Sequence, residues 1–405
     1  MPLANLRLDD PGTFVDGFPH DAFRWLRAHE PVSWLDDGEG SGFWVVTRYD
    51  DVGRVARDHA RFTSERGTML RVRTTGDGAA GKMLVVTDPP RHTRLRQVMG
   101  AAFTPRRLRA LEPEVAGIVT DLVERFAAEG GGDFVARVAV PFPVDVICGL
   151  LGIPRADRPR LSRLTSSAFG ADDEAHRLGP TARATTLQAH FELLDYFGAL
   201  VEARRRAPDD GVVTALVAAE PDGAPLAADE IVFNCFNLLI GGNETTRHAA
   251  SGGLLALLEF PEQRRRLRED PDGLPVAVEE VLRWTTPGLH FVRTATADVE
   301  VGDRLVRSGD AVSLWVASAN RDEAVFDAPD RFDVGRDPNR HMTFGQGAHY
   351  CLGSALARLE LRLLFGALQP HLEGMELAGD VRHLRSNFIH GIDRLPVSVR
   401  PLGRA

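Results

Sequence analysis

The stretch Phe344-Gly345-Gln346-Gly347-Ala348-His349-Tyr350-Cys351-Leu352-Gly353 carries the most specific pattern in the chain. Its glycines at positions 345 and 347 allow a loop to turn tightly beside a flat ligand. Cys351 stands just before an apolar run with helical spacing, Leu352, Leu356, Leu359 and Leu363. We therefore expect Cys351 at the amino terminus of a helix, where backbone N–H groups favour a thiolate over a thiol.

Two simpler interpretations of this stretch compete with a metal-binding thiolate. In the first, Cys351 is a buried core cysteine and the glycines form an ordinary turn. In the second, the glycines cradle a phosphate, but Tyr350 stands where the third glycine of such a loop belongs and no βαβ unit precedes it. Cys148 and Cys235 have no comparable context, and we expect both to be packed apolar side chains.

The stretch resembles the haem-ligand loop of the cytochrome P-450 family, which it matches at the phenylalanine, both loop glycines, the cysteine and the glycine that follows. The resemblance implies that heme b is the cofactor, that Cys351 is its iron ligand and that dioxygen is a co-substrate. A thiolate ligand pushes electron density onto haem iron and favours O–O cleavage. The residues that the resemblance places against the haem in this loop are Phe344, Gly345, His349 and Gly353.

A second pattern, Gly241-Gly242-Asn243-Glu244-Thr245-Thr246, lies inside residues 229–259, a proline-free segment that predicts one long interior helix. Two successive glycines inside a helix cost about 1 kcal/mol each relative to alanine, so they need a reason. The Thr245 hydroxyl can bond the carbonyl of Gly241, four residues back, and open a small notch for dioxygen and water. The alternative is that Thr245 only bonds its own helix while Glu244 is solvated.

This second pattern resembles the family's Gly-x-acid-Thr signature. The resemblance implies that the Thr245 hydroxyl hydrogen-bonds the dioxygen, that Glu244 helps to relay protons, and that Gly241 and Gly242 lie against the haem. The reaction needs two protons at the distal oxygen, and these groups can deliver them through water.

Haem carries two propionates, which need buried cations or hydrogen-bond donors. Residues 88–96 resemble the family's haem-facing helix, in which His92 and Arg96 are one helical turn apart. Arg293 and His349 match the family's other propionate donors. Any one of these side chains alone would also fit a surface position, but four in matching contexts predict the propionate site.

Glu280 and Arg283 form Glu-x-x-Arg in a helical stretch. This spacing usually gives an exposed salt bridge, and two other pairs share it, Glu202/Arg205 and Glu262/Arg265. Only the first pair lies between the long helix and the cysteine loop, where the family keeps a buried pair. The resemblance continues at Asp330-Arg331-Phe332 and implies that Arg331 joins a structural network there.

The substrate pocket is predicted from the stripe on which Thr245 lies. Asn237 is on the same stripe, two turns away, so it belongs to the distal wall if Thr245 faces the iron. A buried carboxamide needs partners, and a backbone group and a polar group of the substrate are equally good candidates. We expect the rest of the wall to be apolar, with His290 and His390 as further anchors, and to consist of Leu238, Leu289, Phe291, Val292, Phe388 and Ile389.

The composition excludes several other classes of protein. The net charge is −9 and only Lys82 of the 48 basic residues is a lysine, so neither nucleic acid nor an anionic membrane is suggested as a partner. The longest apolar run, near residues 231–242, is shorter than the roughly 20 residues of a membrane span. No secretory signal is apparent, and three widely separated cysteines suit a reducing cytoplasm.

The remaining patterns predict a mainly α fold with a minor β part. We expect a hairpin from residues 31–35 and 43–47, helices across residues 88–288, short strands at 299–301, 304–306 and 311–316, and a last helix after Cys351. The resemblance covers the chain from about residue 20 to its end. It implies a single haem domain, residues 1–405, with the family's helical prism and small β-sheets around a buried haem.

These patterns predict a monooxygenase that hydroxylates, or otherwise oxidises, a small organic substrate, free or bound to a carrier protein. Residues 290–293, 318–322 and 385–389 also resemble members that act on sterols or secondary metabolites. Secondary metabolite tailoring is therefore the first expectation and a sterol or terpenoid hydroxylase its alternative. Further alternatives are a haem-thiolate oxidase that couples rings or desaturates without inserting oxygen, and a haem sensor or binding protein.

The chain has no room for a flavin reductase beside a full haem domain. We therefore expect electrons from NAD(P)H to arrive through a separate ferredoxin and ferredoxin reductase, or a flavodoxin. The docking site would be a basic patch near Arg106, Arg107 and the cysteine loop. We also expect the protein to be a monomer.

Overall fold

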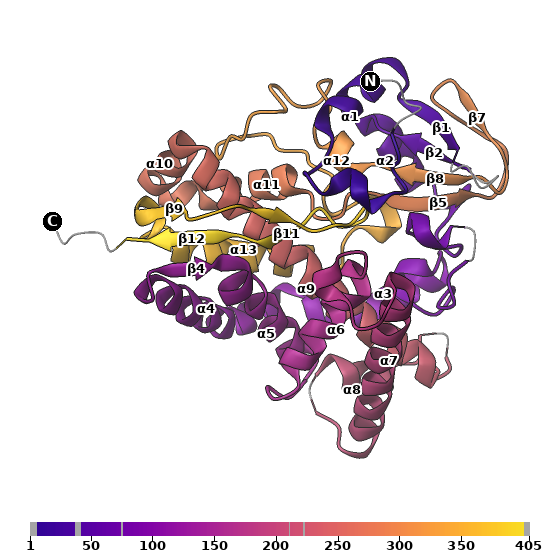
Figure 1. Ribbon diagram of the computed structural model, residues 1–405. Helices are drawn as coiled ribbons and strands as arrows, with labels where there is room; N and C mark the ends of the chain where they lie inside the picture. Colours follow the sequence, from indigo (N-terminus) through magenta and orange to yellow (C-terminus); the bar gives the residue numbers. More distant parts are fainter. Residues whose placement is uncertain (1–5, 37–41, 74–75, 210, 222, 401–405) are drawn as a thin grey trace.

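The computed structural model describes residues 6–36, 42–73, 76–209, 211–221 and 223–400. This part of the chain is mainly helical with small β-sheets, as predicted (Figure 1). The helices are α1 (His20–His29), α2 (Tyr49–Arg57), α3 (Arg91–Gly100), α4 (Pro105–Ala128), α5 (Pro141–Leu150), α6 (Arg158–Gly170), α7 (Ala182–Arg206), α8 (Val212–Val217), α9 (Ala228–Glu259), α10 (Pro261–Glu269), α11 (Leu274–Thr285), α12 (Val316–Ala319) and α13 (Ser354–Leu368).

The strands of the described residues form four small sheets, ordered β1-β2-β8-β5-β3, β4-β12-β9, β6-β7 and β10-β11. Their bounds are β1 (Val32–Asp36), β2 (Gly42–Val46), β3 (Phe62–Thr63), β4 (Gly131–Asp133), β5 (Phe291–Ala295), β6 (Val299–Val301), β7 (Arg304–Val306), β8 (Ala311–Leu314), β9 (Met375–Leu377), β10 (Arg382–His383), β11 (Ile392–Arg394) and β12 (Pro396–Val399). In the largest sheet, β5 pairs antiparallel with β8 and places Arg293 opposite Val312.

The predicted hairpin is confirmed, since β1 and β2 pair antiparallel with Val32 opposite Val46. Its connecting residues, 37–41, lie outside the described residues. The strand predicted at 311–316 ends at Leu314, because the chain turns into α12 at Val316. None of the described helices is long and apolar enough to cross a membrane.

Helix α9 runs through the middle of the fold and joins two apolar cores. Its first half, from Ile231 to Ile240, packs into a core with α5, α7 and α8. Its second half, from Ala249 to Leu257, packs into another core with α4, α11 and α13. A helix that is apolar on nearly every side is stable only in such an interior position. The polar residues 241–248 are therefore held between the two cores.

Candidate active site

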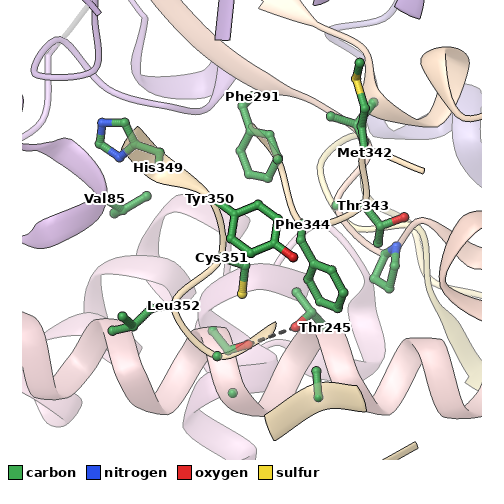
Figure 2. Close-up of a pocket in the computed structure, with 18 of the residues that line it drawn as sticks. Val85, Thr245, Phe291, Met342, Thr343, Phe344, His349, Tyr350, Cys351 and Leu352 are labelled. Atoms are coloured by element: carbon green, nitrogen blue, oxygen red, sulfur yellow. Dashed lines mark hydrogen bonds between the residues drawn. The ribbon is translucent and has the colours of Figure 1, made fainter. Parts of the chain in front are cut away.

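A cavity of about 300 Å³ lies between this polar segment of α9 and the cysteine loop. Gly241, Gly242 and Thr245 line it from α9, and the loop from Phe344 to Gly353 lines it from the other side. Figure 2 shows the Cys351 sulfur pointing towards the helix that carries Thr245. The sequence thus brings its two most specific patterns, about a hundred residues apart, to one site.

The cysteine loop is held by its own backbone. The Cys351 N–H donates to the Phe344 carbonyl at 2.8 Å, and Gly345 and Gly347 have φ angles of +71° and +73°. A Cβ at Gly347 would also lie 2.8 Å from the Ala56 carbonyl oxygen, so no side chain fits there. The two glycines therefore have the role that the sequence predicts for them, a tight turn.

The structure corrects the expected cause of thiolate character at Cys351. Helix α13 begins three residues later, at Ser354, and burial raises the pKa of the thiol. The Gly353 N–H and the charges of Arg96 and Arg358 act in the opposite direction. A coordinated metal ion supplies the larger positive charge, because a coordinating thiol loses its proton outright.

Beside the loop, four basic side chains line the cavity: His92, Arg96, Arg293 and His349. His92 is buried and, among the described residues, neither of its ring nitrogens has a hydrogen-bond partner. Burial lowers the pKa of Arg293 to about 10, and within the described residues its guanidinium donates one hydrogen bond, of 2.9 Å, to the Val292 carbonyl. The His349 ring contacts the His92 ring, with centroids 4.4 Å apart.

This cluster has unsatisfied donors and a surplus of positive charge in a buried place. Unpartnered buried donors are costly, and a carboxylate ligand would satisfy them with strong, charge-assisted hydrogen bonds. The cluster therefore fits the two propionates of a haem, and the Cys351 sulfur fits its iron. Burial also lowers the pKa values of His92 and His349, to about 4 and about 2, so both rings are neutral donors near pH 7.

The glycines of α9 serve different purposes. The Thr245 hydroxyl donates to the Gly241 carbonyl at 2.8 Å, as expected (Figure 2). A Cβ at Gly241 would meet no atom within 4 Å, so this glycine leaves open space in the cavity wall. A Cβ at Gly242 would lie 2.8 Å from Ile147, so this glycine lets α5 pack closely against α9.

Glu244 is buried, but it is not among the residues that line the cavity. It points away because consecutive helical residues are rotated by about 100°. One of its oxygens lies 2.9 Å from Arg247 Nη2, and the other lies 3.2 Å from Asn243 Nδ2. Glu244 is therefore not solvated, as the simpler interpretation of the sequence expects, and it is not part of the cavity lining either.

The structure corrects most of the predicted substrate wall. Asn237, Leu238 and Phe291 line the cavity, whereas Leu289, His290, Val292, Phe388 and Ile389 do not. Strand alternation explains Val292: Phe291 and Arg293 face the cavity, and Val292 packs on the other face with Leu289. His290 is buried between Trp315 and Phe388, and His390 bonds the Thr285 carbonyl.

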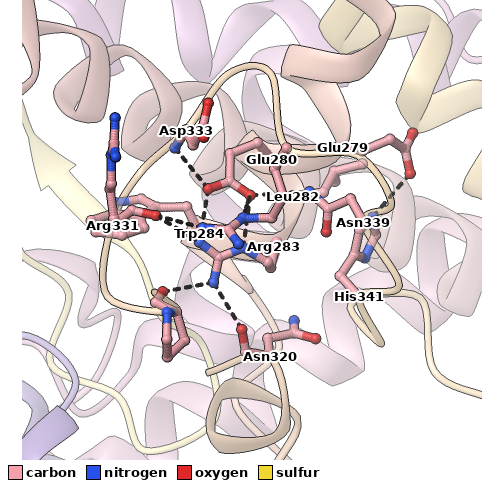
Figure 3. A network of polar contacts seen from close by, with 12 residues as sticks. Glu279, Glu280, Leu282, Arg283, Trp284, Asn320, Arg331, Asp333, Asn339 and His341 are labelled. Carbon is pink, nitrogen blue, oxygen red and sulfur yellow. Dashed lines mark hydrogen bonds and ion pairs between the residues drawn. The ribbon is translucent and has the colours of Figure 1, made fainter. Parts of the chain in front are cut away.

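Glu280 and Arg283 form the predicted buried pair, with two hydrogen bonds of 2.7 Å and both side chains fully buried (Figure 3). Arg331 contributes only its backbone carbonyl, which accepts from Arg283 at 3.2 Å, while the residue itself is exposed. The guanidinium that does join the pair is that of Arg336, 3.1 Å from Glu280. Arg331 therefore takes part in the network through its backbone and not through its side chain.

Several buried polar residues of the site were not identified from the sequence. Arg247 is paired with Glu244, and Glu360 lines the cavity from α13. Asn234 uses its carboxamide to bond Leu84 N–H and the Lys82 and Glu230 carbonyls, which fastens the loop before α3 to α9. The sequence signal for Asn234 is the one that points to Asn237, a polar residue inside an apolar helix.

The comparisons with known proteins cover nearly the whole chain. The family model described as Cytochrome P450 matches residues 180–371. The chain is 42% identical to Cytochrome P450 NovI of Streptomyces niveus over 98% of its length and 97% of that protein. The chain belongs to the cytochrome P450 family.

Two further relatives agree with this assignment. Linalool 8-monooxygenase of Pseudomonas putida is 36% identical over 97% of this chain and 98% of that protein. The structure of P450 OxyD, described as involved in the biosynthesis of vancomycin-type antibiotics, superposes with a TM-score of 0.87 at 38% identity and covers 98% of this chain and 100% of that one. As a cytochrome P450 the chain is a haem-thiolate monooxygenase that uses dioxygen.

Proposed function

We propose that this cytochrome P450 hydroxylates a small organic substrate in the tailoring of a secondary metabolite. The observation that carries the chemistry is the one cavity that Cys351 and Thr245 line from opposite sides. OxyD is the relative that favours a tailoring step, because it is described as involved in the biosynthesis of vancomycin-type antibiotics. Linalool 8-monooxygenase favours the alternative, a terpenoid substrate.

In this proposal Cys351 ligates the haem iron and the four basic side chains around His92 and Arg293 hold the propionates. Phe344, Gly345 and Gly353 form the loop beside the ring, and Gly241 and Gly242 form the opposite wall. When bound, haem supplies dioxygen activation, with the thiolate donating electron density. The apolar lining, including Leu238 and Phe291, excludes water and holds the substrate.

Protons are handled by residues of α9. The Thr245 hydroxyl, held by the Gly241 carbonyl, positions a proton at the cavity wall. Glu244 is one residue away, behind the wall, in an ion pair with Arg247. It delivers protons only when that pair opens and the carboxylate turns towards Thr245 or a water between them. Asn237 lines the cavity and its side chain makes no hydrogen bond with the described residues, which favours its role as a polar contact for the substrate.

We further propose that residues 1–405 act as one haem domain, as a monomer in the cytoplasm. Its electrons come from NAD(P)H through a ferredoxin and its reductase, or a flavodoxin. Arg106 and Arg107 are exposed at the start of α4 and fit an acidic partner. Cys148 and Cys235 are buried, and burial raises the pKa of each thiol to about 12, so neither offers a thiolate.

Replacement of Cys351 tests this function. Cys351→Ala should abolish the thiolate-type spectrum of the carbon monoxide complex, while Cys148→Ala and Cys235→Ala should keep it. Product formation from candidate metabolites with NADPH, ferredoxin and reductase then separates an enzyme from a haem sensor. A thiolate-type spectrum in the Cys351→Ala protein would overturn the proposal.

A further inference from the structure

Arg71 lies in the loop between β3 and α3, where one wall of the cavity is formed. Thr68, three residues before it, lines the cavity, and the Thr68 carbonyl accepts a hydrogen bond of 2.9 Å from Val292 of β5. Leu84 and Val85, later in the same loop, line the cavity as well. The loop that carries Arg71 is therefore fixed to the active site on both sides of this residue.

Arg71 stands out because its charge is not neutralised locally. With the described residues it makes no hydrogen bond and no ion pair within 4.0 Å, and Asp172 and Asp77 act on it only from farther away. Other arginines in the same region of the fold are paired, as Arg91 is with Glu230 and Arg158 with Asp145. The guanidinium has five N–H donors that suit a carboxylate or phosphate.

Arg71 is exposed to solvent and lies against an aromatic ring. Desolvation by the protein around it lowers the pKa of its guanidinium. Its guanidinium carbon is 5.6 Å from the centre of the Phe169 ring of α6.

A row of three aromatic rings leads from Arg71 back to the cavity. Phe169 lies 6.1 Å from Phe388, and Phe388 lies 6.3 Å from Phe291, measured between ring centroids. Phe291 lines the cavity, and all three residues are partly exposed, although they lie among buried elements. The row offers an apolar path between the reaction site and the Arg71 cation, with successive rings inclined by 35° and 83° to one another.

We propose that Arg71 binds an anionic oxygen group of the substrate, at the end remote from the oxidised carbon, while the row of rings holds the apolar body in between. This assignment rests on the proposed function. It narrows the substrate class to organic anions, either free carboxylic acids or molecules joined to a carrier protein through a phosphodiester. A charge-assisted hydrogen bond beside an aromatic ring, where water is partly excluded, contributes more than the same contact in water.

Probes that are fixed at the iron test the inference without knowledge of the substrate. Alkylimidazoles bind haem iron through nitrogen and shift its absorption spectrum, and their tails then extend into the cavity. We would titrate the haem-loaded protein with a series of imidazolyl-alkanoic acids of increasing chain length and with their methyl esters. At the best length the acid should bind about tenfold more tightly than its ester, because one charge-assisted contact is gained.

The variants assign that preference to one side chain. Arg71→Gln should abolish the preference for the acid, and Arg71→Lys should keep part of it. Arg66→Gln removes the same charge from an exposed position in the same loop and should leave the preference unchanged. Equal binding of acid and ester at every length, or an unchanged preference in Arg71→Gln, would overturn the proposal.

A second pair of probes distinguishes the two sources of the anion. The imidazole tail would end in phosphopantetheine in one probe and in a carboxylate in the other, and the tighter, Arg71-dependent binder identifies the source. Imidazole itself, which has no tail, reports whether the haem is present and accessible. If imidazole fails to shift the spectrum, the proposed function fails; if imidazole binds and the tails show no preference, only the role of Arg71 fails.

Discussion

Two buried glutamate–arginine pairs with the same three-residue spacing lie on neighbouring helices and are bonded very differently. Glu280 and Arg283 of α11 bond each other twice at 2.7 Å, and Arg283 also donates to the Asn320 and Pro329 carbonyls at 2.9 Å (Figure 3). Glu280 additionally accepts from the Asp333 N–H, Arg336 and Asn339. No capacity for hydrogen bonding is left over in this pair.

The pair on α9 is incompletely bonded. Arg247 Nη2 lies 2.9 Å from Glu244 Oε2, but this contact lacks hydrogen-bond alignment, and that oxygen has no hydrogen-bond partner among the described residues. The same holds for the neighbouring Asn243 Oδ1. Arg247 is shared with Ser166 Oγ at 2.7 Å and His248 Nε2 at 3.1 Å.

The comparison distinguishes a pair that stabilises the fold, Glu280 and Arg283, from a pair that we assign to proton delivery, Glu244 and Arg247. A buried charge that has lost its water is stable only if hydrogen bonds replace it, and Glu280 meets that condition. Glu244 does not, and it sits directly behind the cavity wall. An unsatisfied buried group in a native protein calls for a functional reason, and proton delivery next to Thr245 is that reason here.

The largest effect is expected at the fully bonded pair. Glu280→Ala leaves the Arg283 guanidinium buried without its carboxylate, which should cost about 3–5 kcal/mol of stability. Urea denaturation and haem content would measure the loss. Glu202→Ala is the matched control, since it breaks a pair of the same spacing on the surface, where the two groups are 3.5 Å apart and the expected cost is below about 1 kcal/mol. Equal losses in the two variants would remove the distinction.

The same comparison shows how far sequence could lead. The spacing Glu-x-x-Arg predicts nothing by itself, and position relative to the cysteine loop and α9 was needed to select Glu280. The structural role of Arg336 and the pairing of Glu244 with Arg247 were not predictable, because both depend on which way side chains turn after packing. Cys351, Thr245 and the propionate cluster were identified because each belongs to a motif. The substrate wall has no motif, and there the prediction was right for Asn237, Leu238 and Phe291 and wrong for the others, which are Leu289, His290, Val292, Phe388 and Ile389.

At the incompletely bonded pair we expect loss of activity rather than of fold. Glu244→Gln keeps the shape and the contact with Asn243 but cannot carry a proton as a carboxylic acid does. Turnover should fall by about 100-fold, while the carbon monoxide spectrum and the unfolding midpoint stay close to those of the unaltered protein. Steady-state product formation at saturating substrate measures the effect. If Glu244→Gln loses as much stability as Glu280→Ala does, the pair of Glu244 and Arg247 stabilises the fold and the assignment to proton delivery is wrong.

A smaller effect on electron consumption is expected one residue further along α9. Thr245→Ala removes the hydroxyl that donates to the Gly241 carbonyl and lines the cavity. Without it, no hydroxyl at position 245 positions a proton at the cavity wall. NADPH oxidation should continue at a similar rate, with more of its electrons released as peroxide or water and less product formed. The ratio of product to NADPH consumed reports this directly. Thr245→Ser, which restores the hydroxyl, should recover the ratio, and an unchanged ratio in Thr245→Ala would take the hydroxyl out of the mechanism.

Glu360 is a third buried glutamate. It differs from Glu280 and Glu244 because no arginine of the described residues pairs with it. It lines the cavity from α13, and its carboxyl accepts one hydrogen bond from the described part of the chain, a long one of 3.5 Å from the Thr246 hydroxyl. Burial raises the pKa of its carboxyl well above 4.5, with the Thr246 hydroxyl acting in the opposite direction. Burial therefore favours the neutral form of the Glu360 carboxyl, whereas Glu280 and Glu244 each have an arginine partner.

The free energy of unfolding should depend on pH differently in Glu360→Gln and in the unaltered protein. We expect this difference to be the smallest effect of the series. The folded protein holds a proton that the unfolded chain releases above its ordinary pKa of 4.5, so the contribution of Glu360 to stability is full below pH 4.5 and is lost as pH rises towards the folded pKa. Glutamine mimics the neutral acid and carries no such penalty.

Urea unfolding at a series of pH values measures the difference. In acid, the free energy of unfolding should change with pH by the same slope in the two proteins. Above pH 4.5 the unaltered protein should lose stability relative to Glu360→Gln, by at most about 1.4 kcal/mol for each pH unit. Parallel curves of unfolding free energy against pH over that range would mean that Glu360 is ionised in the folded protein. The distinction between paired and neutral buried glutamates would then be wrong.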